Sequence, residues 1–260
     1  MTVVLGAIAP HGNPVFEESG AKTRAAIEEL ARRLAAAHTE AAIIVTPHGL
    51  HVDGQFGVVR SGRLEEQPNV FVDQAHLYRG AGEPELADAC VRALREDGLP
   101  AAGLTFGTSL AGSSVMPVDW GAGIPLWFLR IPAVVVTPCR ALSNEEHVRA
   151  GAALARATGG GRVAFIASAD HGHGLDPDGP YGFSEHSQPY DDDIVRAVEA
   201  NDLAALVAWE PQRAYDALAD SLWQLLMLHG ALGDGFGAEL LSYEAPTYFG
   251  MLVAAFAPRT

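Results

Sequence analysis

Cysteine is scarce in this chain, with only Cys90 and Cys139 and no CxxC pair. Cys90 falls in a helical pattern, and Cys139 follows an apolar run typical of a strand. Two cysteines so far apart exclude a cysteine-rich zinc site and argue against a disulfide framework. The cysteine usage therefore predicts a protein of a reducing compartment, the cytoplasm.

Basic charge is also scarce: 17 Lys and Arg face 32 Asp and Glu, which gives a formal net charge of -15. Nucleic acids and anionic membranes attract basic surfaces, so neither is expected as a partner. Lys22 is the single lysine, which disfavours Schiff-base chemistry. No apolar run is long enough to cross a bilayer, and Met1-Thr2-Val3 offers no basic start for a signal peptide.

Several common catalytic motifs are missing as well. The chain has no HExxH metalloprotease motif, no phosphate-binding loop, no GxGxxG fingerprint and no GxSxG nucleophile elbow. The function must therefore be sought in less common patterns.

Patterns typical of strands and helices alternate along the chain, and no linker or low-complexity tract interrupts them. This alternation predicts a single α/β catalytic domain over 1–260, with a central mixed, mainly parallel sheet flanked by helices on both faces. Ser143 and Glu146 form a capping-box pattern that predicts a helix start. The expected strands lie at 3–9, 41–45, 56–59, 131–136, 163–167 and within 238–256. Helices are expected at 17–37, 83–96, 191–209 and 212–230, and loops at 103–116 and 174–189.

The tripeptide Pro-His-Gly occurs twice, each time directly after an apolar run. The two histidines, His11 and His48, should therefore follow the carboxyl ends of two buried strands, where open α/β sheets form their ligand sites. Either histidine alone is better explained as a strand-end cap. The matched pair favours shared ligation of one metal ion, because imidazole suits Zn, Cu, Fe and Ni.

A third ligand remains open at this point. Glu244 stands in a mainly apolar and aromatic segment, 243–250, where an ionised carboxylate needs a cation or a partner. It is predicted either to bind the metal or to pair with an arginine. With two histidines it would complete the facial triad typical of non-haem Fe(II).

A second histidine pair follows the strand at 163–167, in the segment Ser168–Gly174. Glycines flank His173 and make its loop accessible, and an unperturbed imidazole titrates near neutrality. These features predict a general acid/base role for His173. The alternatives are a hydrogen-bonded turn with Asp170, or one of His171 and His173 as the third metal ligand.

With these motifs in this order, nearly the whole chain resembles the class III extradiol ring-cleavage dioxygenases, the family typified by the catalytic subunit of protocatechuate 4,5-dioxygenase. The resemblance implies an α/β core with a mixed sheet. It also implies Fe(II) held by His11, His48 and Glu244, with His173 as the catalytic histidine. Many members carry Asp-His-Gly where this chain has Asp119-Trp120-Gly121, so Trp120 replaces a histidine of the substrate pocket.

The resemblance implies ring opening of a catechol-type substrate, or of an aminophenol, by O₂. Trp120, His171 and Tyr243 are expected to line the substrate pocket, and Arg140 is a candidate partner for an anionic substrate. Two alternatives stay open: a Zn-dependent hydrolase with the same ligands, and a Memo-like binding protein without catalysis. Homo-oligomerisation or a small second subunit is also compatible with the sequence, and the loop at 174–189 is a candidate lid.

Overall fold

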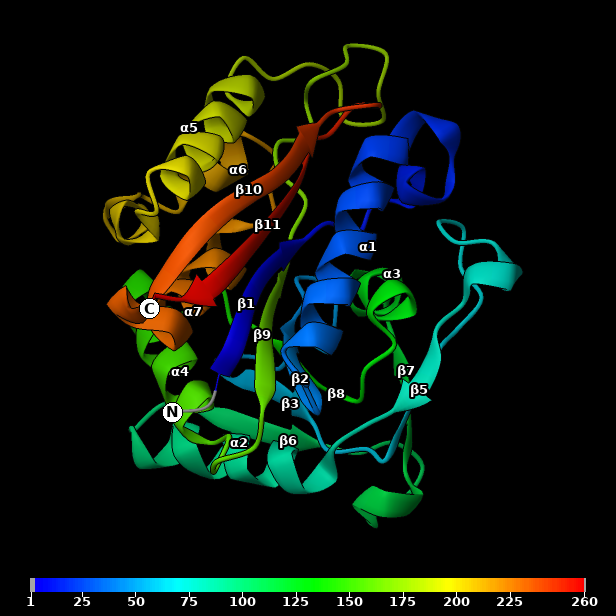
Figure 1. Cartoon of the computed structure of the whole chain (residues 1–260), viewed down its shortest axis with the longest axis vertical. Coiled ribbons are helices and arrows are strands. Elements are labelled where there is room, and N and C mark those ends of the chain that lie inside the picture. Colours follow the sequence, from blue (N-terminus) through cyan, green and yellow to red (C-terminus); the bar gives the residue numbers. More distant parts are fainter. Residues whose placement is uncertain (1–2, 260) are drawn as a thin grey trace.

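Eight strands form one mixed sheet in the order β10-β11-β1-β9-β2-β8-β3-β6 (Figure 1). The structure is a computed structural model that describes residues 3–259. At the centre, β1, β9, β2 and β8 run parallel, and antiparallel pairs join β11 to β1 and β3 to β8. The strands are β1 (Val3–Ala9), β2 (Ala41–Val45), β3 (Phe56–Val59), β6 (Ala101–Leu104), β8 (Ala133–Thr137), β9 (Val163–Ser168), β10 (Phe236–Glu244) and β11 (Met251–Pro258).

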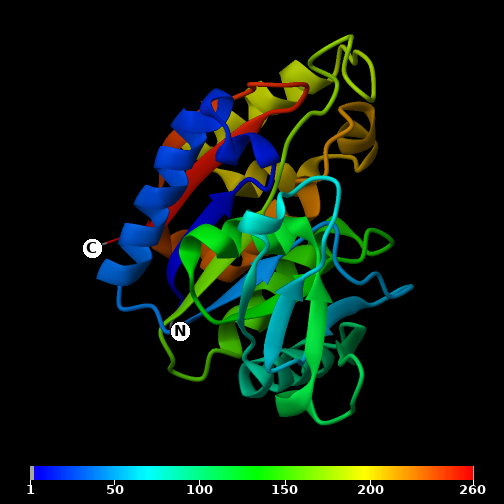
Figure 2. The same cartoon turned by 90° about the vertical axis from the view of Figure 1, so that its right-hand side faces the viewer.

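A second, three-stranded sheet in the order β5-β4-β7 lies beside helix α3, on the side of the molecule that faces the viewer in Figure 2. Its strands are β4 (Arg63–Glu66), β5 (Arg79–Ala81) and β7 (Val115–Val118). The α-helices are α1 (Ala21–Ala36), α2 (Pro84–Glu96), α3 (Trp120–Leu129), α4 (Asn144–Arg156), α5 (Ser187–Glu199), α6 (Gln212–Asp216) and α7 (Leu222–Leu232).

Helices cover both faces of the large sheet, as the alternation predicts. Successive residues of β2 point to opposite faces, so Ile43 and Val45 enter one core and Ala42 and Ile44 the other. The first core is closed by α2, α4, α5 and α7, and the second by α1, α3 and the small sheet. The predicted fold class, α/β with a mixed sheet between helical layers, is confirmed.

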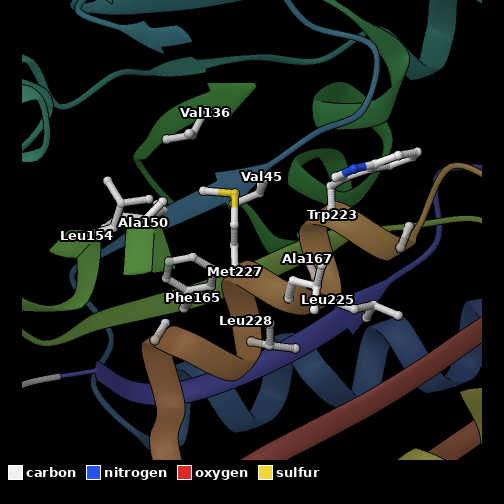
Figure 3. Close-up of a cluster of buried hydrophobic side chains, with 14 of the residues drawn as sticks. Val45, Val136, Ala150, Leu154, Phe165, Ala167, Trp223, Leu225, Met227 and Leu228 are labelled. Atoms are coloured by element: carbon white, nitrogen blue, oxygen red, sulfur yellow. The ribbon is translucent and has the colours of Figure 1, made fainter. Parts of the chain in front are cut away.

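The first core is densest where α7 crosses α4 over the strands. Figure 3 shows Met227 of α7 extending toward the strands, beside Ala150 and Leu154 of α4. The two helices approach closely because Gly151 faces the backbone of α7: a Cβ on this residue would lie 1.8 Å from the Met227 carbonyl oxygen. This contact anchors α7, whose first turn follows the candidate site.

Most predicted elements are confirmed, including the capping box of Ser143 and Glu146 at the start of α4. Two helices of the second half of the chain differ from the prediction. The helix expected over 191–209 begins earlier, at Ser187, and ends at Glu199, because Asn201 adopts a left-handed backbone with φ 54. The helix expected over 212–230 is two helices, α6 and α7, separated at Leu218 with φ 55.

Several elements were not predicted from the sequence. The segment 103–116, expected as a loop, contains the end of β6 and the beginning of β7, and α3 follows directly. Among residues 3–259, no helix has both the length and the apolar character needed to cross a bilayer.

Candidate metal centre

His11 and His48 meet at the carboxyl edge of the parallel strands. His11 lies two residues after β1 and His48 three residues after β2, and β9 pairs with both strands. Their Nε2 atoms are 3.1 Å apart, and the two rings stand at 89° to each other. The histidines that the repeated tripeptide singled out are therefore brought together with both Nε2 atoms converging on one point.

Asp220 completes a group of three candidate ligands with these histidines. Its Oδ2 atom lies 3.4 Å from Nε2 of His11 and 3.3 Å from Nε2 of His48. Ligand atoms that bind one ion at about 2.1 Å, with bond angles between roughly 90° and 109°, lie about 3.0–3.4 Å apart. The three atoms therefore fit a single first-row metal ion without rearrangement.

The backbone around the site fixes the orientation of Asp220 and His11. Oδ1 of Asp220 accepts a hydrogen bond from the Asp170 backbone N–H (3.3 Å), which leaves Oδ2 facing the histidines. The Ser168 hydroxyl donates to the Gly121 carbonyl, so its oxygen accepts from Nδ1–H of His11 (3.0 Å). This hydrogen bond keeps a proton on Nδ1 of His11 and turns Nε2 toward the group, the orientation that a metal ligand requires.

The charges of the group suit a cation. Burial acts to lower the pKa of His11, but the carboxylates of Asp170 and Asp220 outweigh it and raise the pKa to about 9. Burial acts to raise the pKa of Asp220, but His11 and a hydrogen bond from His48 hold it well below its usual range. At neutral pH His11 therefore carries a second proton, on Nε2, and a metal ion would take the place of that proton.

Glu244, predicted as the third ligand, does not join the two histidines. It is the last residue of β10 and faces α1, where its Oε1 accepts from the backbone N–H (2.7 Å) and the hydroxyl (2.5 Å) of Thr23. Among residues 3–259, the group that includes both histidines contains Asp220 and not Glu244. The alternative prediction, an arginine partner for Glu244, is also wrong: the N-terminus of α1 and the Thr23 hydroxyl stabilise this carboxylate.

His173 lines the same cavity as His11 and His48. Its ring stacks on Phe249 (5.2 Å between centroids, 17°), and Tyr181 meets it edge-on at 5.9 Å. Its backbone N–H donates to the Ala217 carbonyl (3.2 Å), three residues before Asp220. The sequence-predicted acid/base residue therefore lies beside the metal group, within an aromatic wall.

Of the three residues predicted to line the substrate pocket, one lines the cavity and two do not. Trp120 lines the cavity and stacks on His48, with 4.5 Å between ring centroids. His171 is fully buried beneath the cavity, where Nδ1 lies 3.0 Å from the Ser221 hydroxyl and burial lowers its pKa to about 3. Tyr243 also lies outside the lining, because its hydroxyl donates to Asp191 (2.7 Å).

Asp220 was not among the predicted metal ligands, because the helical pattern over 212–230 predicts one continuous helix there. Asp220 and Ser221 directly precede the mainly apolar segment from Leu222 to Leu228, and both residue types are common where a helix starts. That signal could have indicated a new helix. The break places Asp220 in the connection between α6 and α7, at the sheet edge.

Fold and site together define a class: an α/β protein with two histidines and one carboxylate at the carboxyl edge of its sheet. The family model of the catalytic LigB subunit of aromatic ring-opening dioxygenase matches residues 6–254. The chain belongs to this family, as the resemblance of its motifs implied. Enzymes of the family are metal-dependent, and they open aromatic rings with O₂.

Two relatives give the extent of the likeness. Protein CA_C1420 of Clostridium acetobutylicum is 24% identical over 257 residues, which cover 91% of this chain and 54% of that protein. The chain thus spans about half the length of this curated relative. The crystal structure of the uncharacterized protein JW3007 from Escherichia coli K12 matches with a TM-score of 0.68 at 17% identity. That match covers 97% of this chain and 99% of the other, and it shows a common fold.

Proposed function

We propose that this protein is a non-haem Fe(II)-dependent extradiol dioxygenase that opens the ring of a small catechol-type or aminophenol substrate with O₂. The observation that supports this most is the convergence of His11, His48 and Asp220, with ligand atoms 3.1–3.4 Å apart, beside His173. Two histidines and one carboxylate on one side of an ion form the facial triad, which leaves positions open for substrate and O₂.

In this proposal His11, His48 and Asp220 hold the iron. Bound there, Fe(II) would supply Lewis-acid and redox chemistry for the diol and O₂. Ser168 and Asp170 maintain the ligand geometry through their hydrogen bonds to His11 and Asp220.

His173 is assigned the proton transfers. It is placed to accept the proton of a substrate hydroxyl at one ring nitrogen and to return a proton as the ring opens. Its stack on Phe249 fixes the plane of the imidazole. Trp120, which neither accepts nor delivers a proton in catalysis, offers a flat face on which the substrate ring can stack.

The test is O₂ uptake by Fe(II)-loaded protein with a panel of catechols and aminophenols, run with three variants. Asp220→Asn should lose tight iron binding and turnover together. Glu244→Gln is the matched control, because it alters the same chemical group outside the site and should keep both iron and turnover. His173→Ala should keep the iron and lose turnover.

The outcomes separate the alternatives. Iron loss in Glu244→Gln rather than in Asp220→Asn would overturn the ligand assignment. Tight metal without O₂ uptake across the panel would remove the dioxygenase proposal and favour a hydrolase. Full turnover in His173→Ala would remove only the proton-transfer role.

A further inference from the structure

The cavity over the metal group has no lysine or arginine in its lining. None of the 17 Lys and Arg, all of which lie within residues 3–259, is among the lining residues. Arg140, the candidate partner for an anionic substrate, is exposed and places its guanidinium 4.5 Å from the ring centroid of Trp223. Trp223 does not line the cavity, so this arginine is engaged elsewhere.

The floor of the cavity carries carboxylate groups. Asp170 lines it directly, with Oδ2 3.5 Å from Nε2 of His11, and Asp220 adjoins the same nitrogen. The two carboxylates alone would match the two positive charges of a bound divalent ion. This match would leave no surplus positive charge for a further anionic group.

The walls are aromatic on two sides. Phe71 packs on Trp120 with 4.4 Å between centroids on the His48 side. Tyr248 contacts Phe249 at 4.9 Å and Tyr181 at 5.9 Å on the His173 side. Aromatic faces carry negative electrostatic potential and attract cations. A substituent that extends from the substrate ring toward the cavity mouth would therefore meet these faces and no lysine or arginine.

We propose that the natural substrate is an aromatic diol whose ring substituent is cationic or uncharged, with an alkylammonium group preferred, and that ring-borne carboxylates are discriminated against. A carboxylate in this cavity would lose water and gain no cationic partner. An ammonium group would lie near carboxylates and aromatic faces. The inference rests on the proposed function, because it assumes that the diol oxygens face the metal group.

Three catechols of similar size test the charge preference: 4-(2-aminoethyl)catechol, 4-ethylcatechol and 3,4-dihydroxyphenylacetate. Their dissociation constants would be measured by anaerobic calorimetry on the Fe(II)-loaded protein at about 0.15 M salt, and kcat/KM by O₂ uptake. We expect the carboxylate to bind at least tenfold more weakly than the neutral catechol, and the amine to bind as tightly as the neutral catechol or more tightly.

A variant that adds a positive charge provides the second test. Asn13 is exposed and lines the cavity, so Asn13→Arg introduces the missing cation. Ala36→Arg is the control, because Ala36 is exposed near the amino end of β2, whereas His48 follows its carboxyl end. Asn13→Arg should shift the ratio of the amine and carboxylate constants at least fivefold toward the carboxylate. Ala36→Arg should leave that ratio unchanged, because salt screens distant charges.

The two proposals fail in different ways. Carboxylate binding as tight as amine binding, no binding of any of the three, or equal shifts in the two arginine variants would overturn the substrate inference. If the amine binds most tightly and the carboxylate most weakly but no O₂ is consumed, the dioxygenase proposal is overturned and the charge preference is supported. If O₂ is consumed but the carboxylate is the preferred substrate, the dioxygenase proposal is supported and the charge preference is overturned.

Discussion

His147 should make the protein sensitive to mild acid. The side chain is fully buried in α4 against Phe56, and its Nδ1–H donates to the Ser143 carbonyl (2.8 Å). Its Nε2 is buried and has no hydrogen-bond partner within the described part of the chain. Protonation of Nε2 would bury an unpaired charge, so burial lowers the pKa of His147 from 6.5 to about 4.

The sign of the effect follows from proton binding. Between pH 6.5 and 4 the unfolded chain binds a proton at this histidine and the folded chain does not, so stability is lost as the pH falls. The full span of 6.5 - 4 = 2.5 pH units corresponds to about 3.4 kcal/mol at 1.36 kcal/mol per unit. About 2 kcal/mol of it should be lost between pH 7.5 and pH 5.

His147→Asn isolates this contribution. The Asn amide keeps a donor for the Ser143 carbonyl but does not titrate. Urea unfolding of metal-free protein, followed by circular dichroism at pH 7.5 and pH 5, would give the free energies of unfolding. The variant should be less stable at pH 7.5, because it leaves a small cavity, but should lose about 2 kcal/mol less than the wild type on acidification.

A matched control is His51→Asn, which removes an exposed histidine and should keep the pH dependence of the wild type. Other groups, including His171, titrate equally in both chains and cancel in the comparison. Equal losses in the wild type and in His147→Asn, to within about 0.5 kcal/mol, would refute the argument.

Three further predictions concern packing, ligand orientation and a buried acid. Gly151→Ala should reduce the free energy of unfolding by about 1–3 kcal/mol, seen as a lower urea midpoint, because its Cβ would collide with the backbone of α7. Ser168→Ala should weaken metal binding by about 10–100-fold in a chelator competition, because His11 loses its acceptor; unchanged affinity would exclude this orienting role. Burial raises the pKa of Asp191 to about 7, so this group is ionised at pH 8.5 and protonated at pH 5.5. Tyr243→Phe removes a hydrogen-bond donor to Asp191 and should therefore reduce the free energy of unfolding more at pH 8.5 than at pH 5.5. An equal reduction at both pH values would contradict this prediction.

The local pattern of the sequence was sufficient for most of the sheet. Apolar runs predicted β1, β2, β3, β8 and β9 within one or two residues, and the paired Pro-His-Gly motifs placed both histidines at the right edge. These predictions succeed because a buried strand and the residue that follows it are defined by neighbours in the chain.

The helix interruptions could not be read from periodicity. The left-handed residue Leu218 stands within a segment of helical pattern, in the connection between the end of α6 and the start of α7. Glu244 was chosen because a carboxylate in an apolar segment needs a partner. The Glu244 carboxylate does have a partner, but this partner is Thr23, which lies 221 residues away in the sequence.

The sequence by itself determined the α/β class, the family and the meeting of His11 with His48, because apolar runs and the motifs that end them are local. Only the tertiary structure decided which carboxylate joins these histidines, since Asp220 and Glu244 are chemically equivalent candidates until their backbones are placed. It also decided that no arginine reaches the cavity. Ligand choice and substrate charge depend on distances between segments far apart in the chain, and packing alone sets those distances.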